Sequence, residues 1–540
     1  MKMKFFAASL LIAGASLSSM AQGYKDGIEY YKVGQLDNAK ELLERNLNAA
    51  STNKAEAYFY LGQIALKQGN AAEAKSMYDK GVAADANFPY NYVGQGQLEL
   101  KNGGKANDLF DAARKLSKKD AALESAIATA YFEVNPTTYA KEIDKCIKNA
   151  RKWKPQDPES YLFEGDTYAA KEDYGMAAGQ YELAYTYDPD NVEAHVKWAN
   201  TYYFVNRDMA LQHLEDLNKQ RPNSALVQRQ LAEKYYESNM GSKAAEKYGE
   251  YIKNPNHFAQ DEVRYVQLLF FGEKYQESYD LATSLIGKLS AGDSKIFFMQ
   301  RMKLYNDLML KNYQQGVADG DAFFALPLPQ NTTYQVKDYT DYAEALSEAG
   351  QAEKAVAAYE KAIELNPNNV ELLRDLSQSY SDAKDYAKAA YYYEKVVNSE
   401  ASVANDLYQA SRRFYNYAAT TEDAAVKAEA IAKAYKYIKE VNEKVPDNVP
   451  IVNQMARVEK FDEGAKVTGK AAASYKKLVA LLDAKEDASD YDNEYRNAYQ
   501  YLAAYAMETG DKATAKEYYK KWLDHDAQNE QLRKYVESFK

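Results

Sequence analysis

Residues 337–397 read KDYTDYAEALSEAGQAEKAVAAYEKAIELNPNNVELLRDLSQSYSDAKDYAKAAYYYEKVV, and this stretch contains one pattern twice. In each copy, apolar residues stand at helical spacing on both sides of a short turn. Five positions of the first copy recur 34 residues later in the second: Tyr342 with Leu376, Leu346 with Tyr380, Ala355 with Ala389, Tyr359 with Tyr393, and Ala362 with Val396. The stretch therefore predicts two consecutive helix pairs.

Each copy also places a small residue where its two helices approach and a large aromatic residue one turn later, and Pro367 follows the first copy. The period and the apolar signature resemble those of the tetratricopeptide repeat. The resemblance implies an all-α fold, a right-handed superhelical solenoid of antiparallel helix pairs. In such a solenoid the first helix of each pair lines a concave face.

The same pattern extends over nearly all of the chain and predicts about eleven to fourteen helix pairs. It loosens between residues 258 and 326, and Pro327 and Pro329 then break the helical spacing. The predicted organisation is an N-terminal solenoid at residues 22–326, a loop or hinge at 327–336, and a C-terminal solenoid at 337–540 that ends in a capping helix.

The first 21 residues have the features of a secretory signal peptide. Lys2 and Lys4 precede an apolar run, and Ser19-Met20-Ala21 supplies small residues at a cleavage site. The apolar run is too short to span a bilayer, and the predicted cleavage site lacks the cysteine of a bacterial lipoprotein. We therefore expect an exported envelope protein of a Gram-negative bacterium, periplasmic or associated with the outer membrane, with neither a membrane span nor a lipid anchor.

The net charge of −11 argues against a nucleic-acid partner, because it provides no general basic field. The chain has 50 tyrosines and only 3 tryptophans, and tyrosine suits the half-exposed seams between stacked helices. Its single cysteine, Cys146, lies beside Ile143 and Ile147 on a predicted helix. The pattern indicates a buried thiol, with a disulfide-linked dimer as the alternative.

No catalytic, metal or cofactor motif is present, so we expect no enzyme, no metal and no cofactor. The four histidines lack zinc-protease spacing, although His195 and His213 fall on adjacent helices and could meet. No third ligand for a metal is evident beside them. The acidic stretch Asp319-Gly320-Asp321 lacks the other oxygen ligands of a calcium loop, and we predict a turn there.

Candidate partner-contact residues occupy first-helix positions between the signature residues. They combine cations, an amide and aromatic rings, which suits the binding of an extended peptide. In the repeat of Trp198 and in the next repeat they are Lys197, Asn200, Tyr203, Phe204, Arg229, Glu233 and Tyr236. Chaperone-binding relatives clamp a terminal carboxylate with lysine, asparagine and arginine at such positions. Here Asp166, Leu226, Gln230 and Asp375 occupy several of them, so we do not expect that ligand.

The resemblance implies a non-enzymatic scaffold or adaptor that binds protein or peptide partners on its concave face, as part of an outer-membrane assembly or secretion complex. The alternative is a glycan-binding helical-repeat protein of the cell envelope, in which tyrosines would stack on sugars. The nearly continuous repeats and the absence of an anchor cysteine favour the scaffold.

Overall fold

The computed structural model describes residues 23–539, which are almost entirely helical and contain no strand. The prediction of an all-α fold is therefore confirmed. The predicted signal peptide, residues 1–21, lies outside the described residues. Within the described part, no helix has both the length and the apolar character needed to cross a membrane. The chain divides into two compact units: unit 1 ends at Ala291 and unit 2 begins at Gly292.

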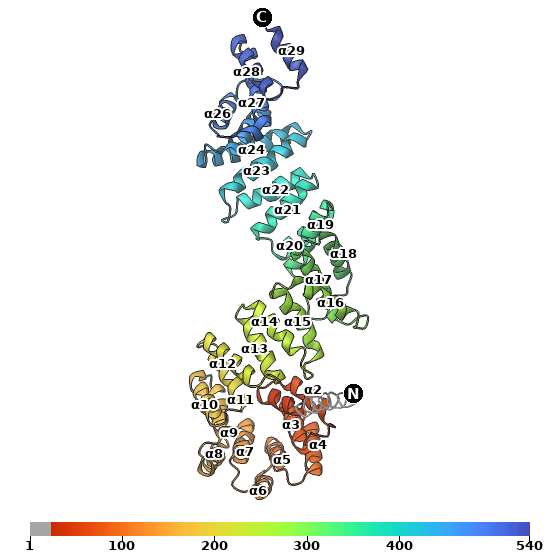
Figure 1. The fold of residues 1–540 in the computed structure, drawn as a ribbon, viewed down its shortest axis with the longest axis vertical. Helices are drawn as coiled ribbons and strands as arrows, with labels where there is room; N and C mark the ends of the chain where they lie inside the picture. The colour runs from red at the N-terminus through yellow and green to blue at the C-terminus, as the bar shows by residue number, and fades with distance from the viewer. Residues whose placement is uncertain (1–22, 540) are drawn as a thin grey trace, which may run out of the picture. The chain divides into compact units, whose positions relative to one another are not determined.

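Unit 1 is a stack of antiparallel helix pairs, coloured red to yellow-green in Figure 1. Its described helices form eight such pairs. The first helix, α1, is described over residues 23–32. The others are α2 (Leu36–Asn46), α3 (Lys54–Lys67), α4 (Ala71–Ala84), α5 (Tyr90–Lys101), α6 (Asn107–Leu116), α7 (Ala121–Val134), α8 (Ala140–Trp153), α9 (Pro158–Ala169), α10 (Tyr174–Tyr187), α11 (Val192–Tyr202), α12 (Arg207–Gln220), α13 (Ala225–Glu237), α14 (Gly241–Tyr251), α15 (Ala259–Phe271) and α16 (Tyr275–Ile286).

Unit 2 has the same construction, with six helix pairs followed by a final short helix among its described residues. Its helices are α17 (Lys295–Met309), α18 (Tyr313–Phe324), α19 (Val336–Glu348), α20 (Ala352–Leu365), α21 (Val370–Asp382), α22 (Tyr386–Val397), α23 (Ala404–Thr420), α24 (Ala424–Lys444), α25 (Val449–Glu463), α26 (Ala472–Asp483), the 3₁₀ helix η1 (Ser489–Tyr491), α27 (Asp492–Glu508), α28 (Lys512–Asp524) and α29 (Glu530–Ser538).

The pair α9 and α10 shows how the signature residues produce a helix pair. The side chain of Asp157 caps α9 by accepting a hydrogen bond from the backbone N–H of Ser160, and Pro158 takes the first helical position, where no N–H is needed. Gly165 then faces the ring of Tyr181, and a Cβ atom on Gly165 would lie 2.3 Å from that ring. The glycine is therefore required by close helix contact.

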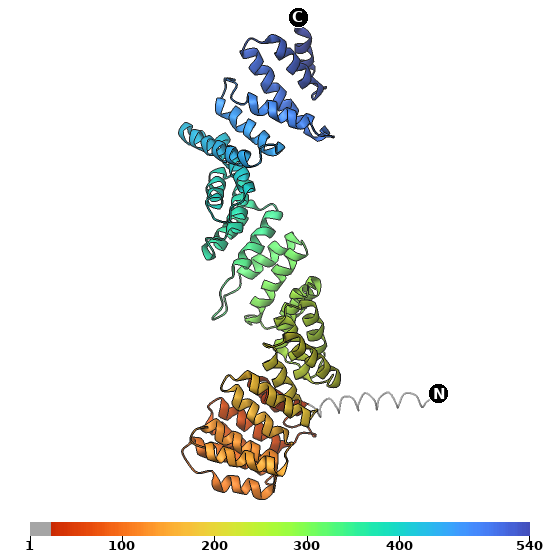
Figure 2. The ribbon, with the colours of Figure 1, turned by 90° about the vertical axis from the view of Figure 1, so that its left-hand side faces the viewer.

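Unit 1 closes on itself through α1. The ring of Tyr30 packs edge-on against Phe258 at a centroid distance of 5.3 Å. The Nδ2 of Asn256 donates a hydrogen bond to the buried carboxylate of Asp26 at 2.7 Å. Figures 1 and 2 place the red N-terminal helices beside the later, yellow helices of the same unit. The first helix pair thus contacts pairs that lie some 200 residues further along the chain.

The predicted loop or hinge at residues 327–336 overlaps a helix-free segment at 325–335 that lies inside unit 2. Arg301 holds this segment, because its Nη2 donates to the backbone oxygen of Thr333 at 3.2 Å and to Asp338 at 2.8 Å. The ring of Tyr334, near the end of this segment, also packs against the ring of Phe323 on α18. Pro327 and Pro329 therefore end the helix, but the segment that contains them stays packed within unit 2. The boundary between the two units lies earlier in the chain, after Ala291.

The predicted turn at Asp319-Gly320-Asp321 is wrong, because these residues lie within α18. Gly320 is helical here for a packing reason. A Cβ atom at this position would lie 2.2 Å from the ring of Tyr342, which occupies the space beside the helix. A glycine flanked by two acidic residues suggests a turn when only local sequence is considered. The residue that explains the glycine, Tyr342, belongs to the next helix pair, so local sequence does not reveal the contact.

Cys146 is a free thiol and is 2% exposed, which confirms the prediction of a buried cysteine. Its Sγ lies 3.5 Å from the Nη2 of Arg114. Burial raises the pKa of Cys146 to about 12, with a further contribution from the carboxylate of Glu124. The sulfur is therefore a thiol under ordinary conditions and serves in packing.

Candidate functional site

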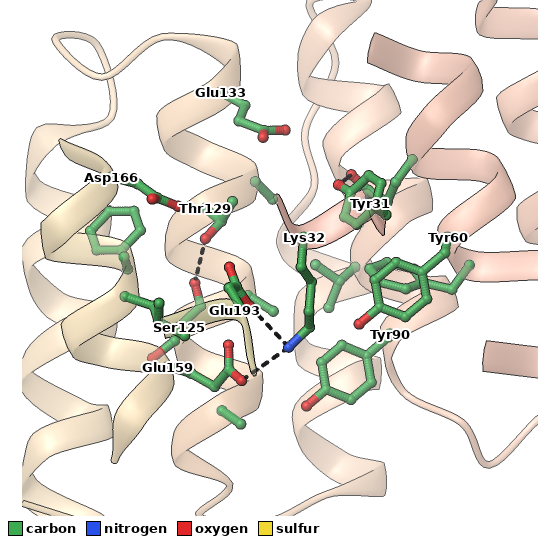
Figure 3. A pocket seen from close by; sticks show the side chains of 18 of the residues that line it. Tyr31, Lys32, Tyr60, Tyr90, Ser125, Thr129, Glu133, Glu159, Asp166 and Glu193 are labelled. Carbon is green, nitrogen blue, oxygen red and sulfur yellow. Dashed lines mark hydrogen bonds and ion pairs between the residues drawn. The ribbon is translucent and has the colours of Figure 1, made fainter. Parts of the chain in front are cut away.

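One functional candidate is a cavity of about 580 Å³ in unit 1 (Figure 3). Its walls come mainly from the first helices of six successive pairs, and its volume lies within the roughly 300–1,000 Å³ range of ligand sites. Its polar and aromatic lining includes Tyr31, Lys32, Tyr60, Gln63, Lys67, Tyr90, Gln97, Ser125, Thr129, Glu133, Glu159, Asp166, Glu193 and Lys197. The cavity is therefore a half-open hollow in the concave face.

An ionic ladder crosses one wall of the cavity. Lys32, from α1, points to two carboxylates of α9 and α11, with its Nζ 3.4 Å from Glu159 and 3.1 Å from Glu193 (Figure 3). Glu193 also lies 2.8 Å from the Nζ of Lys197, which in turn lies 2.8 Å from Asp166. The ladder links α1 to α9 and α11, so it closes unit 1 and shapes the cavity at the same time.

The two lysines of this ladder stabilise the ionised carboxylate of Glu193. Burial alone would raise the pKa of Glu193, but Lys197 and Lys32 together lower it below its ordinary value. Burial opposes the charge of Lys32, yet Glu159 and Glu193 raise its pKa well above the ordinary lysine value. Both lysines of the ladder therefore remain cationic when the carboxylates face them.

A second, largely neutral ladder also lines the cavity. Gln63 of α3 donates to Gln97 of α5 at 2.9 Å, and Gln97 donates to Glu133 of α7 at 2.7 Å. Glu133 is also paired with Lys67. Tyr31 donates to Gln63 at the far end, at 3.5 Å. Amide groups that both donate and accept suit recognition of a peptide backbone, whose groups also alternate between donor and acceptor.

Aromatic rings also line the cavity. Tyr31 and Tyr60 contact each other edge-on at 5.1 Å, and Phe59 lies 5.7 Å from Tyr90. The hydroxyl groups of Tyr60 and Tyr90 lie near the Nζ of Lys32 in Figure 3. Burial raises the pKa of both phenols, so they are neutral donors. The lining as a whole contains five carboxylates and three lysines, which gives it a negative formal balance.

Among the seven predicted contact residues, only Lys197 lines this cavity. It lies on α11, and its ammonium group is shared between Glu193 and Asp166. Asn200 follows one turn later on the same helix and is half-buried. The structure therefore brings one predicted cation into the site, already paired with two carboxylates.

Tyr203 and Phe204 follow the end of α11 and point to different surroundings. Tyr203 is 5% exposed, its hydroxyl lies 2.7 Å from the Oγ of Ser238, and the Nζ of Lys234 lies 4.5 Å from its ring centre. Phe204 is 86% exposed. Tyr203 therefore packs inside the unit, whereas Phe204 faces outward.

Arg229, Glu233 and Tyr236 lie on α13 and contact α15. Arg229 is paired with Asp261 at 2.8 Å and also donates to Gln35 at 3.0 Å, so it helps to hold the start of unit 1. Glu233 accepts from Arg264 at 2.9 Å, and the same guanidinium group lies 4.3 Å from the ring centre of Tyr236. These three side chains are engaged in contacts between successive repeats.

Most cavity residues were missed by the sequence prediction, although a signal for them exists. Gln63 and Gln97 are exactly one repeat apart, and so are Glu159 and Glu193. Polar residues at equivalent positions of buried first helices mark a shared polar face. Lys32 has no such signal, because its partners are 127 and 161 residues away and meet it only when unit 1 closes.

The two predicted neighbouring histidines do meet. The Nδ1 of His195 lies 2.8 Å from the Nε2 of His213, and the Nε2 of His195 lies 3.0 Å from the carbonyl oxygen of Pro189. Because that carbonyl can only accept, His195 donates to it and accepts from His213. Across the described residues, no group of three or more histidine, cysteine, aspartate or glutamate side chains is placed to hold a metal ion.

The chain is similar to several known proteins over limited lengths. A relative from Pyropia yezoensis, the uncharacterized protein ycf37, is 44% identical over 50 residues, which span 9% of this chain and 28% of that relative. The structure of the C-terminal part of a TPR repeat-containing protein from Cytophaga hutchinsonii aligns with a TM-score of 0.40 and 19% identity. That alignment covers 50% of this chain and 98% of the other.

A second solved structure, YrrB, is described as a TPR protein with an unusual peptide-binding site. It aligns with a TM-score of 0.29 and 17% identity, over 38% of this chain and 92% of its own. Two sequence-family models match more specifically. The model for a tetratricopeptide repeat matches residues 24–89, and the model for a TPR repeat matches residues 343–383. One stretch of each unit therefore consists of tetratricopeptide repeats, as the 34-residue period predicts.

Proposed function

We propose that this protein is a non-enzymatic scaffold that binds an extended segment of a protein partner in the inner cavity of unit 1. The observation that supports this most directly is the composition of the cavity wall. Six first helices contribute an amide ladder, an ionic ladder and several tyrosine rings to one concave surface. Stacked repeats commonly use this surface for protein binding.

The two ladders supply different parts of such an interaction. Gln63 and Gln97 can exchange their mutual hydrogen bond for bonds to a peptide backbone at little net cost, since both are amides. Tyr60 and Tyr90 offer flat faces to side chains. Because carboxylates outnumber lysines in the lining, the cavity favours a neutral or positively charged segment over an acidic one.

We further propose that the protein is exported and acts in the periplasm or at the outer membrane, within an assembly or secretion complex. The support is the amino-terminal sequence, in which Lys2 and Lys4 precede an apolar run and a small-residue site at Ser19-Met20-Ala21. N-terminal sequencing of the protein recovered from the envelope fraction tests this step. Recovery of the uncleaved chain from the cytoplasm would contradict it.

The binding step is tested by crosslinking in native envelopes, followed by mass spectrometry. Ala126 lines the cavity from α7, and an Ala126→Tyr variant fills part of that space. Ala72 is exposed on α4, so Ala72→Tyr adds the same group outside the cavity. We expect the wild type and the Ala72 variant to capture the same protein partner, and the Ala126 variant to lose it.

Equal capture by both variants would place the interaction elsewhere. Failure of the wild type to recover any stoichiometric protein partner would contradict the scaffold itself. If binding to a panel of envelope polysaccharides were found instead, and were lost in the Ala126 variant, the glycan-binding alternative would replace it.

A further inference from the structure

Four of the seven arginines of unit 2, Arg412, Arg413, Arg457 and Arg533, make no ion pair among the described residues, and the first three lie on neighbouring first helices. Arg412 and Arg413 lie on α23, and Arg457 lies on α25. Within residues 23–539, none of the three has a carboxylate at ion-pair distance. By contrast, Arg374 on the preceding first helix pairs with Asp406 at 2.8 Å. Three unpaired guanidinium groups on neighbouring helices are notable in a chain with a net charge of −11.

Arg413 gives the clearest sign of a missing partner. It is 6% exposed, yet its hydrogen bonds go only to neutral groups, the Oε1 of Gln378 and the Oγ of Ser381. Its Nε is buried and has no acceptor within the described structure. Burial lowers the pKa of Arg413, and the neighbouring Arg412 lowers it further. The carboxylate of Asp382 opposes this shift only in part, so the cation of Arg413 remains incompletely compensated inside the unit.

The arginines adjoin aromatic rings. The guanidinium carbon of Arg457 lies 4.9 Å from the ring centre of Tyr415, and Tyr415 contacts Phe461 edge-on at 5.4 Å. Arg412 precedes Tyr415 by three residues on α23, so both lie on one face of that helix. Arg412 and Arg457 are exposed, and Tyr415 is half-buried. We call Arg412, Arg413, Tyr415, Arg457 and Phe461 the arginine–tyrosine surface.

The neighbouring carboxylates are engaged elsewhere. Glu394 pairs with Lys433 at 3.0 Å. Glu463, at the end of α25, accepts hydrogen bonds from the backbone N–H groups of Thr468 and Ala471. Glu459 is buried on α25, and burial raises its pKa, which weakens it as an internal counter-ion. Asp382, at the end of α21, acts on Arg413 electrostatically but is not at ion-pair distance, so no carboxylate of the described residues pairs directly with the arginine–tyrosine surface.

We infer that the arginine–tyrosine surface binds an acidic segment of a protein partner, whose aspartate or glutamate side chains bond to the exposed guanidinium groups of Arg412 and Arg457 while its apolar groups rest on Tyr415 and Phe461. Arginine is suited to this task because its planar group binds carboxylates through two parallel hydrogen bonds. The inference rests on the proposed scaffold function and adds the chemistry of a partner segment. It concerns unit 2 alone and is separate from the cavity of unit 1.

The test uses the full chain and fluorescence anisotropy with two labelled peptides. One peptide of about eight residues alternates glutamate with leucine, and the other alternates lysine with leucine; this length exceeds the ~10 Å between neighbouring helices. The variant Arg412→Glu/Arg457→Glu reverses the two exposed cations. The matched control Arg533→Glu/Lys534→Glu makes the same charge change on α29, where both side chains are exposed.

We expect the wild type and the control variant to bind the glutamate peptide, with affinity that falls as salt is added. The Arg412/Arg457 variant should bind it about tenfold more weakly or worse, since two charge contacts become repulsive. Equal binding of the lysine peptide, no binding of the glutamate peptide, or an equal loss in the control would overturn the inference. If crosslinking still captures a partner in any of these cases, the scaffold function stands and only this site fails.

Discussion

Asp26 makes the closure of unit 1 less stable as the pH rises from acid to neutral. It is 2% exposed, and burial, aided by the carboxylate of Glu29, raises its pKa from 3.8 to about 7. Because the pKa of Asp26 is higher in the folded chain than in the unfolded chain, its contribution to the free energy of unfolding is complete at a pH below the unfolded pKa of about 4. It is lost as the pH rises toward 7. The stability of the closure should therefore fall between about pH 4 and pH 7, because ionisation buries a charge that the hydrogen bond from Asn256 compensates only in part.

An Asp26→Asn variant should keep the closure at high pH, because an amide cannot ionise. We expect hydrogen exchange in residues 23–32 to become faster in the wild type as the pH rises from about 5 to about 8, after correction for intrinsic rates. The variant should gain of the order of 2–4 kcal/mol at the upper end. Glu182→Gln, an exposed change in α10, is the control. Identical pH profiles for Asp26→Asn and the wild type would contradict this assignment.

The pair His195 and His213 has the opposite dependence. Burial, together with His195, lowers the pKa of His213 to about 4, below the ordinary histidine value of about 6.5. The unfolded chain therefore binds a proton that the folded chain excludes, and stability should fall as the pH drops from about 6.5 to about 4. His213→Gln should reduce this acid-side loss.

The same substitution removes the ring that packs 4.5 Å from Trp198, so it should cost about 1 kcal/mol at neutral pH. Thermal unfolding followed by tryptophan fluorescence at several pH values separates the two effects. A variant that loses stability toward acid as steeply as the wild type would show that His213 is not the group responsible.

At the scale of elements, α1 closes unit 1 because one side chain reaches two other helices. Lys32 is half-buried between Glu159 and Glu193, and a Lys32→Met variant leaves both carboxylates short of a cation. We expect a loss of about 1–2 kcal/mol in unit 1, together with faster hydrogen exchange in residues 23–32. Adding Glu159→Gln should restore part of the loss, since it removes one uncompensated charge.

Lys25 is the matched control for this prediction. It lies on the same helix and pairs with Glu56 at 2.9 Å, but its side chain is 52% exposed. Exposed pairs contribute little, so Lys25→Met should change stability by about 0.5 kcal/mol or less. An equal effect of the two lysine substitutions would mean that the ladder does not hold the closure.

The elements themselves were predictable from the sequence because their causes are local. Gly165 and Tyr181 recur within a 34-residue unit, and the contact between them is made inside that unit. The cavity residues were harder to predict from the sequence. Lys32 contacts Glu159 and Glu193 only because several repeats stack into a curved unit that brings α1 beside α9 and α11. Gly320 was misassigned for the same reason, because the ring that explains it belongs to the following pair.

At the scale of the whole molecule, two sites of opposite character lie in separate units. The cavity of unit 1 has more carboxylates than lysines, whereas the arginine–tyrosine surface of unit 2 has cations without ion-paired carboxylates. Under the two proposals above, the chain would hold two segments of different charge at once, either from one partner or from two. This use requires that each unit keep its own structure, which makes the boundary between the units a testable feature.

The boundary can be located by limited proteolysis. Residues 287–294 are free of helix, mostly exposed, and include Gly292 at a φ of +90°. Residues 325–335 are also free of helix, but Arg301 fastens them through Thr333 and Asp338. A nonspecific protease at low concentration should therefore cut first within 287–294 and release two resistant fragments, since cleavage requires local unfolding of the backbone.

An Arg301→Lys variant sharpens this test. Lysine keeps a positive charge, but it lacks the planar guanidinium group whose Nη2 donates to both Asp338 and the backbone oxygen of Thr333. We expect the variant to become susceptible within 325–335 while the cut at 287–294 is unchanged, with the fragments identified by mass spectrometry. If the wild type were cut first at 325–335, the boundary indicated by Pro327 and Pro329 would be the true one. The contacts of Arg301 would then be too weak to join that segment to unit 2.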